Sequence, residues 1–170
     1  MLTFPLSLHL LSPHQNCSQD TGIHHHISSK LVLSLHRFIF CVGDDGRVNP
    51  FSTLKKLNTL VITDCIVLDY LKLCIVSATL VNLTIRTGFS KSEMKFQLST
   101  PNLCTFVYCG HGPLQKLCES NINLSSIENV NLNVEMWVTY IESPLFLLNW
   151  LVELANIKSF SVTSTTLKVI

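Results

Sequence analysis

An apolar doublet, in which two hydrophobic residues flank one other residue, recurs six times along the 170-residue chain. The doublets are Leu33-x-Leu35, Leu60-x-Ile62, Leu83-x-Ile85, Phe106-x-Tyr108, Val130-x-Leu132 and Phe160-x-Val162. Successive doublets begin 27, 23, 23, 24 and 30 residues apart. A repeating unit of roughly 20 to 29 residues is typical of solenoid proteins, in which each unit buries its apolar edge only against its neighbours.

Each doublet fits a short strand, because alternation sends its two apolar side chains to one face of a sheet and the flanking residues to the other. In LKKLNTLVITDC, residues 54–65, the apolar spacing changes from three to two within one segment. This change indicates that the first residues of the segment lead into a strand, which begins where the spacing becomes two. Cys65, three residues after Ile62, stands where the chain would turn under the sheet. Together these spacings match the leucine-rich repeat pattern LxxLxLxx(N/C)xL.

The sequence therefore predicts an α/β fold: a leucine-rich repeat solenoid with a concave sheet of six parallel strands and a mixed helical and irregular convex side. PLFLLNWLVELANI, residues 144–157, has leucines at helical spacing and a proline near its start, which predicts a helix. SKSEMKFQLSTPN, residues 90–102, lacks such a stripe and is expected to be irregular or extended. We expect residues 1–28 to be a poorly ordered leader outside the repeats. Residues 29–170 would form the repeat domain, about six degenerate repeats truncated at the C-terminus.

The composition argues against several classes of partner. With 12 basic and 11 acidic residues, the net charge of +1 gives no electrostatic basis for binding nucleic acid or an anionic membrane surface. The longest apolar stretches are interrupted by polar residues before they reach the roughly 18 to 20 residues of a spanning helix, so no transmembrane segment is predicted. The seven cysteines contain no CxxC pair, which favours free thiols in a reducing compartment over disulfides or zinc.

The outward positions of the six strands define a candidate partner-binding face, because solenoids usually bind on the concave sheet. Small polar side chains dominate these positions. The residues predicted to contact a protein target are His36, Thr63, Arg86, Cys109, Asn129, Asn131, Asn133 and Thr163. An exposed sheet face also needs polar residues for solubility, so the pattern alone fits a binding face and a merely solvated face.

No catalytic, metal or cofactor site is expected. Cys109 and His111 in YCGHG resemble part of a thiol–imidazole or metal site, but the sequence offers no third orienting group or further ligands. Gly110 and Gly112 instead suit a tight turn that leaves the strand. The triplet His24-His25-His26 falls in the leader. The motifs GxGxxG, GK[ST], HExxH and GxSxG do not occur, so the chain is not predicted to be an enzyme.

The chain resembles the leucine-rich region of plant F-box/LRR proteins, the class that often ends in an FBD domain. The stretches that carry the resemblance are LVLSLHRFIF, LKKLNTLVITDC, SATLVNLTI, LSTPNLCTFVYCG, NLSSIENVNLNV and LANIKSFSVTSTTLKVI. The resemblance implies a cytoplasmic or nuclear protein that recognises substrates for a cullin-based ubiquitin ligase. In that family an F-box with an LPDxIL-like opening docks the ligase adaptor. No such run occurs here, so adaptor binding by these residues is not expected.

Two alternatives remain open at the level of sequence. A receptor-type leucine-rich repeat module would carry NxLxGxIP repeats and flanking cysteine pairs, and neither pattern is present. A truncated gene product without a stable role is the second alternative. Because solenoids need polar caps at their ends, an exposed apolar C-terminal end and aggregation of the isolated chain are predicted.

Overall fold

The computed structural model describes residues 30–40, 47–67, 72–88, 94–111, 117, 124–135, 143–154 and 157–167. The predicted leader, residues 1–28, lies outside the described residues, as do the histidine triplet 24–26 within it and Gly112.

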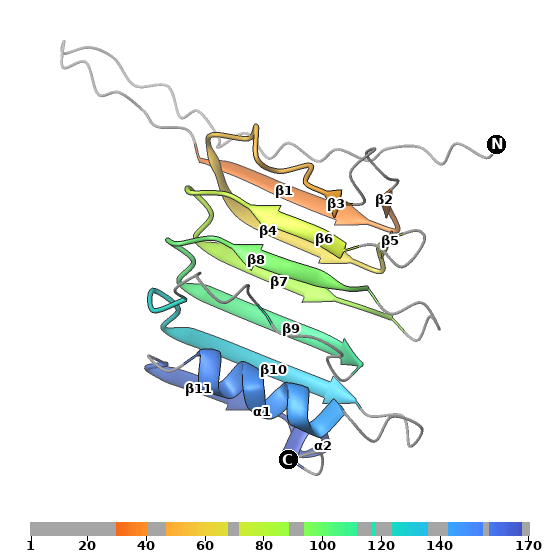
Figure 1. The fold of residues 1–170 in the computed structure, drawn as a ribbon, viewed down its shortest axis with the longest axis vertical. Coiled ribbons are helices and arrows are strands. Elements are labelled where there is room, and N and C mark those ends of the chain that lie inside the picture. Colours follow the sequence, from red (N-terminus) through yellow and green to blue (C-terminus); the bar gives the residue numbers. More distant parts are fainter. Residues whose placement is uncertain are drawn as a thin grey trace, which may run out of the picture.

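Six parallel strands form the main sheet, in the order β1-β4-β7-β9-β10-β11 (Figure 1). The strands are β1 Leu31–His36, β4 Leu57–Thr63, β7 Asn82–Arg86, β9 Thr105–His111, β10 Asn129–Glu135 and β11 Ser159–Val162. The register places every predicted doublet beside the next doublet, so that Leu33 pairs with Leu60, and Val130 with Phe160. The predicted solenoid-like sheet of six parallel strands is therefore confirmed.

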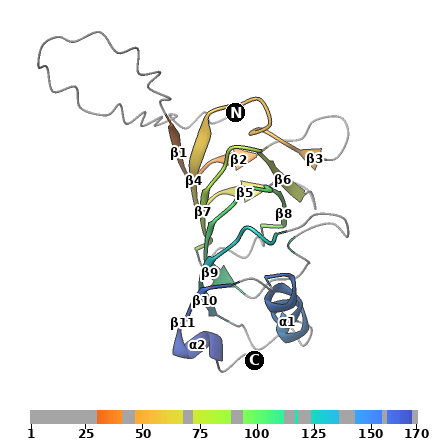
Figure 2. The ribbon, with the colours of Figure 1, turned by 90° about the vertical axis from the view of Figure 1, so that its left-hand side faces the viewer.

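The return segments form a second layer on one side of the main sheet (Figure 2). Its strands are β2 Ile39–Phe40, β3 Arg47–Val48, β5 Ile66–Val67, β6 Lys72–Val76 and β8 Phe96–Ser99. They make two small parallel sheets, β2-β5 and β3-β6-β8. The helix α1, Ser143–Glu153, lies in the same layer beside the last strands, and the one-turn helix α2, Ser164–Leu167, follows β11.

The second layer agrees only in part with the expected mixture of helical and irregular segments. The predicted helix is present as α1, and residues 90–102 include the extended strand β8, as one of the two alternatives anticipated. The difference is that the described returns pair with one another as strands. Leu73, Ile75 and Leu98 are apolar and fully buried, and they stack because successive returns cross at the same level of the solenoid. Neither helix in the described part of the chain has the length and hydropathy to cross a bilayer.

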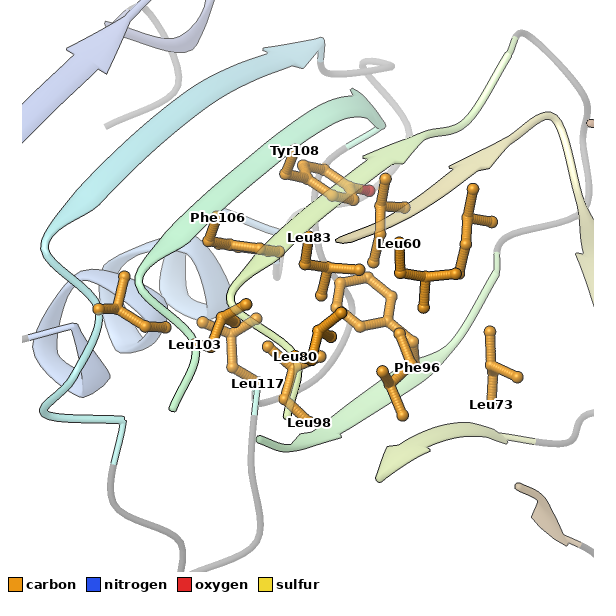
Figure 3. Close-up of a cluster of buried hydrophobic side chains, with 14 of the residues drawn as sticks. Leu60, Leu73, Leu80, Leu83, Phe96, Leu98, Leu103, Phe106, Tyr108 and Leu117 are labelled. Atoms are coloured by element: carbon orange, nitrogen blue, oxygen red, sulfur yellow. The ribbon is translucent and has the colours of Figure 1, made fainter. Parts of the chain in front are cut away.

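The core lies between the two layers (Figure 3). The doublets supply one wall, and the fully buried leucines Leu73 and Leu98 of the second layer supply the other. The residues three positions before the doublets stack in a column of their own: Leu57, Leu80, Leu103 and Ile127. Each is completely buried, and burial of such a side chain stabilises the fold by roughly 1.5 to 3 kcal/mol.

Trp150 joins α1 to both layers. Its ring centroid lies 5.7 Å from that of Phe96 in β8, 6.0 Å from Phe106 and 5.1 Å from Tyr108 in β9. Two hydrogen bonds also connect β8 to α1 through Leu117: the Leu98 amide donates to the Leu117 carbonyl, and the Leu117 amide donates to the side-chain Oε2 of Glu153, 3.0 Å away. Helix α1 is therefore held by aromatic packing in its C-terminal half and by a hydrogen bond at its last residue.

Apolar side chains are exposed at the end of the solenoid that carries α1 and β11. On α1, Leu145, Leu148 and Val152 project away from the core, and Val152 is 76% exposed. Phe160, the first residue of the last doublet, is 45% exposed, because no further described strand covers β11. In the part of the chain that the structure describes, apolar side chains of α1 and β11 are therefore exposed at this end of the sheet.

Trp150→Ala should lower the free energy of unfolding by about 3 to 5 kcal/mol, because it leaves a cavity bordered by three aromatic rings. Urea unfolding followed by circular dichroism measures this loss. Val152→Ala, on the same helix but largely exposed, is the control and should change stability by less than about 0.5 kcal/mol. Equal effects of the two substitutions would contradict the packing of α1 described above.

The double variant Leu145→Lys/Val152→Lys should reduce self-association, because it places two charges on the exposed apolar stripe of α1. Lysine forms helix about as well as leucine, so the unfolding free energy should change by less than about 1 kcal/mol. Sedimentation velocity over a range of protein concentrations measures the association. If this variant associates as strongly as the unmodified chain, another surface is responsible.

Candidate protein-binding face

The main sheet has one face that the second layer does not cover, and this surface is called the open face below. Figure 2 shows the second-layer strands and α1 on the opposite side of the main sheet. The open face holds the outward positions of all six strands. Alternation along each strand sets this division, because the inward neighbours of these positions are the doublets.

The register aligns the outward side chains in three rows that run across the strands. The first row contains Val32, Thr59, Asn82, Thr105, Asn129 and Ser159. The second row contains Ser34, Val61, Thr84, Val107, Asn131 and Ser161. The third row contains His36, Thr63, Arg86, Cys109 and Asn133, and Thr163 continues it beyond β11. The eight predicted partner-contacting residues therefore share one face, six of them in the third row.

Hydrogen bonds between neighbouring strands hold several of these side chains in place. Nδ2 of Asn82 donates to Oγ1 of Thr59 at 3.2 Å in the first row. In the third row, Nδ2 of Asn133 contacts the sulfur of Cys109 at 3.4 Å, and Oγ1 of Thr163 donates to Oδ1 of Asn133 at 3.0 Å. Side chains fixed in this way lose less conformational entropy when a partner binds.

His36 has an acidic neighbour that the sequence did not reveal. Oδ2 of Asp64 lies 3.7 Å from Nε2 of His36, and both side chains are accessible to solvent. Asp64 follows β4 and has a φ of 52°, a left-handed conformation that Asp tolerates better than most residues. The 27-residue offset between the ends of β1 and β4 brings the two together, so the pair depends on strand register and not on proximity in sequence.

The end of the third row is closed by threonines of α2. Oγ1 of Thr163 lies 2.8 Å from Oγ1 of Thr165 and 3.0 Å from Oγ1 of Thr166. The Val134 amide donates to Oγ1 of Thr166, 2.7 Å away. Thr166 is buried and lies beside β10 at the point where β11 has ended. Its hydroxyl therefore accepts the hydrogen bond of the Val134 amide, which a longer β11 would otherwise accept.

Gly110 does not lie in the predicted turn. It is buried within β9, the strand that also carries Cys109 and His111. A Cβ at this position would collide with the hydroxyl of Thr87, which follows the neighbouring strand β7. The glycine is therefore required by the close approach of Thr87 and not by turn geometry.

The structure assembles no metal-binding cluster in the residues that it describes. No group of three or more His, Cys, Asp and Glu side chains converges there, and the sulfur of Cys109 contacts the amide of Asn133. The hydroxyl of Tyr108 donates to the His111 carbonyl at 2.7 Å, which ties down the end of β9.

The described cysteines Cys65, Cys74, Cys104 and Cys109 are free thiols. Cys65 is buried two residues after the end of β4, at the position predicted to turn the chain under the sheet. Its sulfur lies 3.5 Å from the Thr63 carbonyl and 3.7 Å from the Leu35 carbonyl. Burial raises the pKa of the Cys65 thiol, so this group stays protonated and serves as a packing residue.

Alkylation should distinguish Cys65 from the thiols that solvent can reach. Iodoacetamide at mildly alkaline pH should label the half-buried Cys104 and Cys109 first and Cys65 only after unfolding. Mass spectrometry of the labelled peptides measures the order. Because folding raises the pKa of Cys65, the unfolded chain binds fewer protons at high pH. This contribution to stability should therefore be present below the ordinary pKa of 9.0 and be lost as the pH rises from there through the raised pKa of the folded protein. Early labelling of Cys65 would show that it is not buried.

Gly110→Ala should destabilise the protein by about 1 to 3 kcal/mol, because the added methyl group collides with Thr87. The matched variant is Gly110→Ala/Thr87→Ala, in which the colliding hydroxyl is absent. Thermal unfolding of both variants and of Thr87→Ala alone forms a double-mutant cycle. Removal of the Thr87 hydroxyl should restore part of the loss, whereas additive effects would contradict the contact.

Comparison of the chain with protein-family models, with curated proteins and with solved structures gave no match.

Proposed function

We propose that the chain is a non-enzymatic protein-recognition module that binds a protein target through the open face. The observation that carries this proposal is the register of the main sheet. It aligns the outward side chains of six strands, most of them polar, in three rows, and the second layer lies on the other side of the sheet. A solenoid sheet of this kind presents an extended surface on a rigid frame.

The chemistry of the open face favours a protein over a charged polymer. Most of its side chains are uncharged Asn, Ser and Thr, which supply both hydrogen-bond donors and acceptors. Arg86 and His36 are the ionisable groups of the rows besides the Cys109 thiol, and the Asp64 carboxylate lies 3.7 Å from His36. Asn129 and Asn131 are exposed, and their amides match the peptide groups of a partner. A nucleic acid would need a basic surface, which this face does not supply.

The resemblance to plant F-box/LRR proteins supports a more specific proposal. The repeats would be leucine-rich repeats that hold a substrate of a cullin-based ubiquitin ligase, in the cytoplasm or the nucleus. The support comes from the LxxLxLxx(N/C)xL spacing, in which Leu57, Leu60 and Ile62 take the apolar positions and Cys65 takes the turning position. Protein recognition and ligase membership are separate proposals, and one experiment can test both.

The test is a comparison of face and control variants in affinity purification with quantitative mass spectrometry. Arg86→Ala/Asn131→Ala removes two exposed side chains from the middle of the open face, and Lys55→Ala/Lys56→Ala removes two exposed side chains before β4. A true target should be retained by the control and lost with the face variant. With the purified target, the face variant should bind at least about tenfold more weakly, since central polar residues often contribute 1.4 kcal/mol or more.

Two outcomes would contradict the proposals separately. Targets that bind equally well to both variants do not use the open face. A target that depends on the face, without any ligase adaptor or cullin in the purified material, keeps protein recognition but removes the ligase role.

A further inference from the structure

Arg86 carries a full positive charge near the centre of the open face. β7, the strand that bears it, is the third of the six strands in the main sheet (Figure 1). Arg86 is exposed, and its row neighbours are the smaller residues Thr63 and Cys109. Within the three rows, His36 is the only other residue whose side chain can become a cation. A solitary guanidinium therefore stands on a face that is otherwise almost neutral.

No carboxylate of the described residues forms an ion pair with Arg86. The Asp64 carboxylate, which follows the neighbouring strand β4, lies 3.7 Å from Nε2 of His36 instead. Glu135, the last residue of β10, belongs to a strand two places away from β7. An arginine without a partner of its own can form bidentate hydrogen bonds with a carboxylate of another molecule. The charge of Arg86 thus remains available to a partner.

A short apolar strip lies beside Arg86 on the same face. Val61, Thr84 and Val107 are adjacent in the second row, because Thr84 pairs with both valines in the register. All three are half-buried. Thr84 precedes Arg86 by two residues on β7, so the two share the open face at a spacing of about 6.5 Å. The strip can accept an apolar side chain, which is removed from water when it packs there.

The single charge of Arg86 favours a carboxylate over a phosphate group. A phosphorylated side chain carries a charge of about −1.5 to −2 at neutral pH, and it is usually bound by a cluster of arginines. The three rows offer one guanidinium, and the Asp64 carboxylate follows the adjacent strand and would repel a doubly charged group. An aspartate or glutamate side chain matches the charge of Arg86.

We propose that the partner's contact segment carries an aspartate or glutamate side chain that binds Arg86. A neighbouring apolar side chain of the same segment packs on Val61, Thr84 and Val107. This inference rests on the proposed function, because it names the chemistry of the partner that the open face binds. Arg86 takes a central position, in which arginines often contribute most to the affinity of a protein interface.

Selection from a random peptide library displayed on phage, against the immobilised full chain, tests the inference. Enriched peptides should carry Asp or Glu close to an aliphatic or aromatic residue. The same selection against Arg86→Glu should enrich Lys or Arg in place of the acidic residue, because the charge of the site is reversed.

Synthetic peptides from the selection allow the contact to be measured by fluorescence anisotropy. Arg86→Gln should weaken binding at least about tenfold, whereas Lys55→Gln, which removes an exposed charge before β4, should leave it unchanged. Replacing the peptide's acidic residue by its amide should cause a similar loss, and both changes together should cost little more than either alone. Val61→Thr/Val107→Thr keeps the branched shape of the strip but adds hydroxyl groups, and it should also weaken binding.

Three results would overturn the inference, and they separate it from the proposed function. Peptides without an acidic preference that are weakened by Val61→Thr/Val107→Thr but bind Arg86→Gln normally would keep the open face as a binding surface and remove the carboxylate contact. An equal loss with Lys55→Gln would mean a general attraction of anionic peptides to the chain. A selection without enriched peptides, or with peptides that no open-face variant weakens, would contradict the proposed function as well.

Discussion

The structure depends on the parallel register that stacks each apolar doublet on the next. Leu33, Leu60, Leu83, Phe106 and Val130 follow one another across the sheet, so each side chain from Leu60 to Val130 has a counterpart on both sides, and Leu33 in the edge strand has one on the β4 side. A shift of one residue in the pairing register of a strand would move all its side chains to the opposite face of the sheet and expose its doublet. The same register produces the rows of the open face. Core packing and the candidate binding face are thus two consequences of one alignment.

A core built by stacking is weakest where the stack ends. Inner doublets such as Leu83 and Ile85 are fully buried, whereas Leu33 and Leu35 at one end and Phe160 at the other remain accessible. The two ends differ in what covers them. Helix α1 packs Trp150 against three aromatic rings near the C-terminal end but leaves a second apolar stripe outside. At the N-terminal end of the described sheet, Leu33 and Leu35 of β1 pack against the core but are only partly buried.

The open face is preorganised but nearly uncharged. Contacts such as Thr163 to Asn133 and Asn82 to Thr59 link neighbouring strands, so the side chains are fixed by the frame that displays them. Long-range electrostatic attraction can contribute little to recognition on such a surface. Specificity would come from the fit of hydrogen-bonding groups, since a partner that leaves a buried amide unpaired loses binding energy.

The sequence by itself determined the six strands of the main sheet, their order in the chain and the face on which each outward residue lies, because these follow from a local alternation of period two. It also determined the helix that contains Trp150, from spacing within one segment. Only the tertiary structure decided contacts that join positions about 23 to 30 residues apart. The pairing of His36 with Asp64, the requirement for Gly110 beside Thr87 and the small sheets of the second layer belong to this group. Strands as short as Ile39–Phe40 carry too little pattern to be recognised, and they form because the solenoid brings successive returns to the same height.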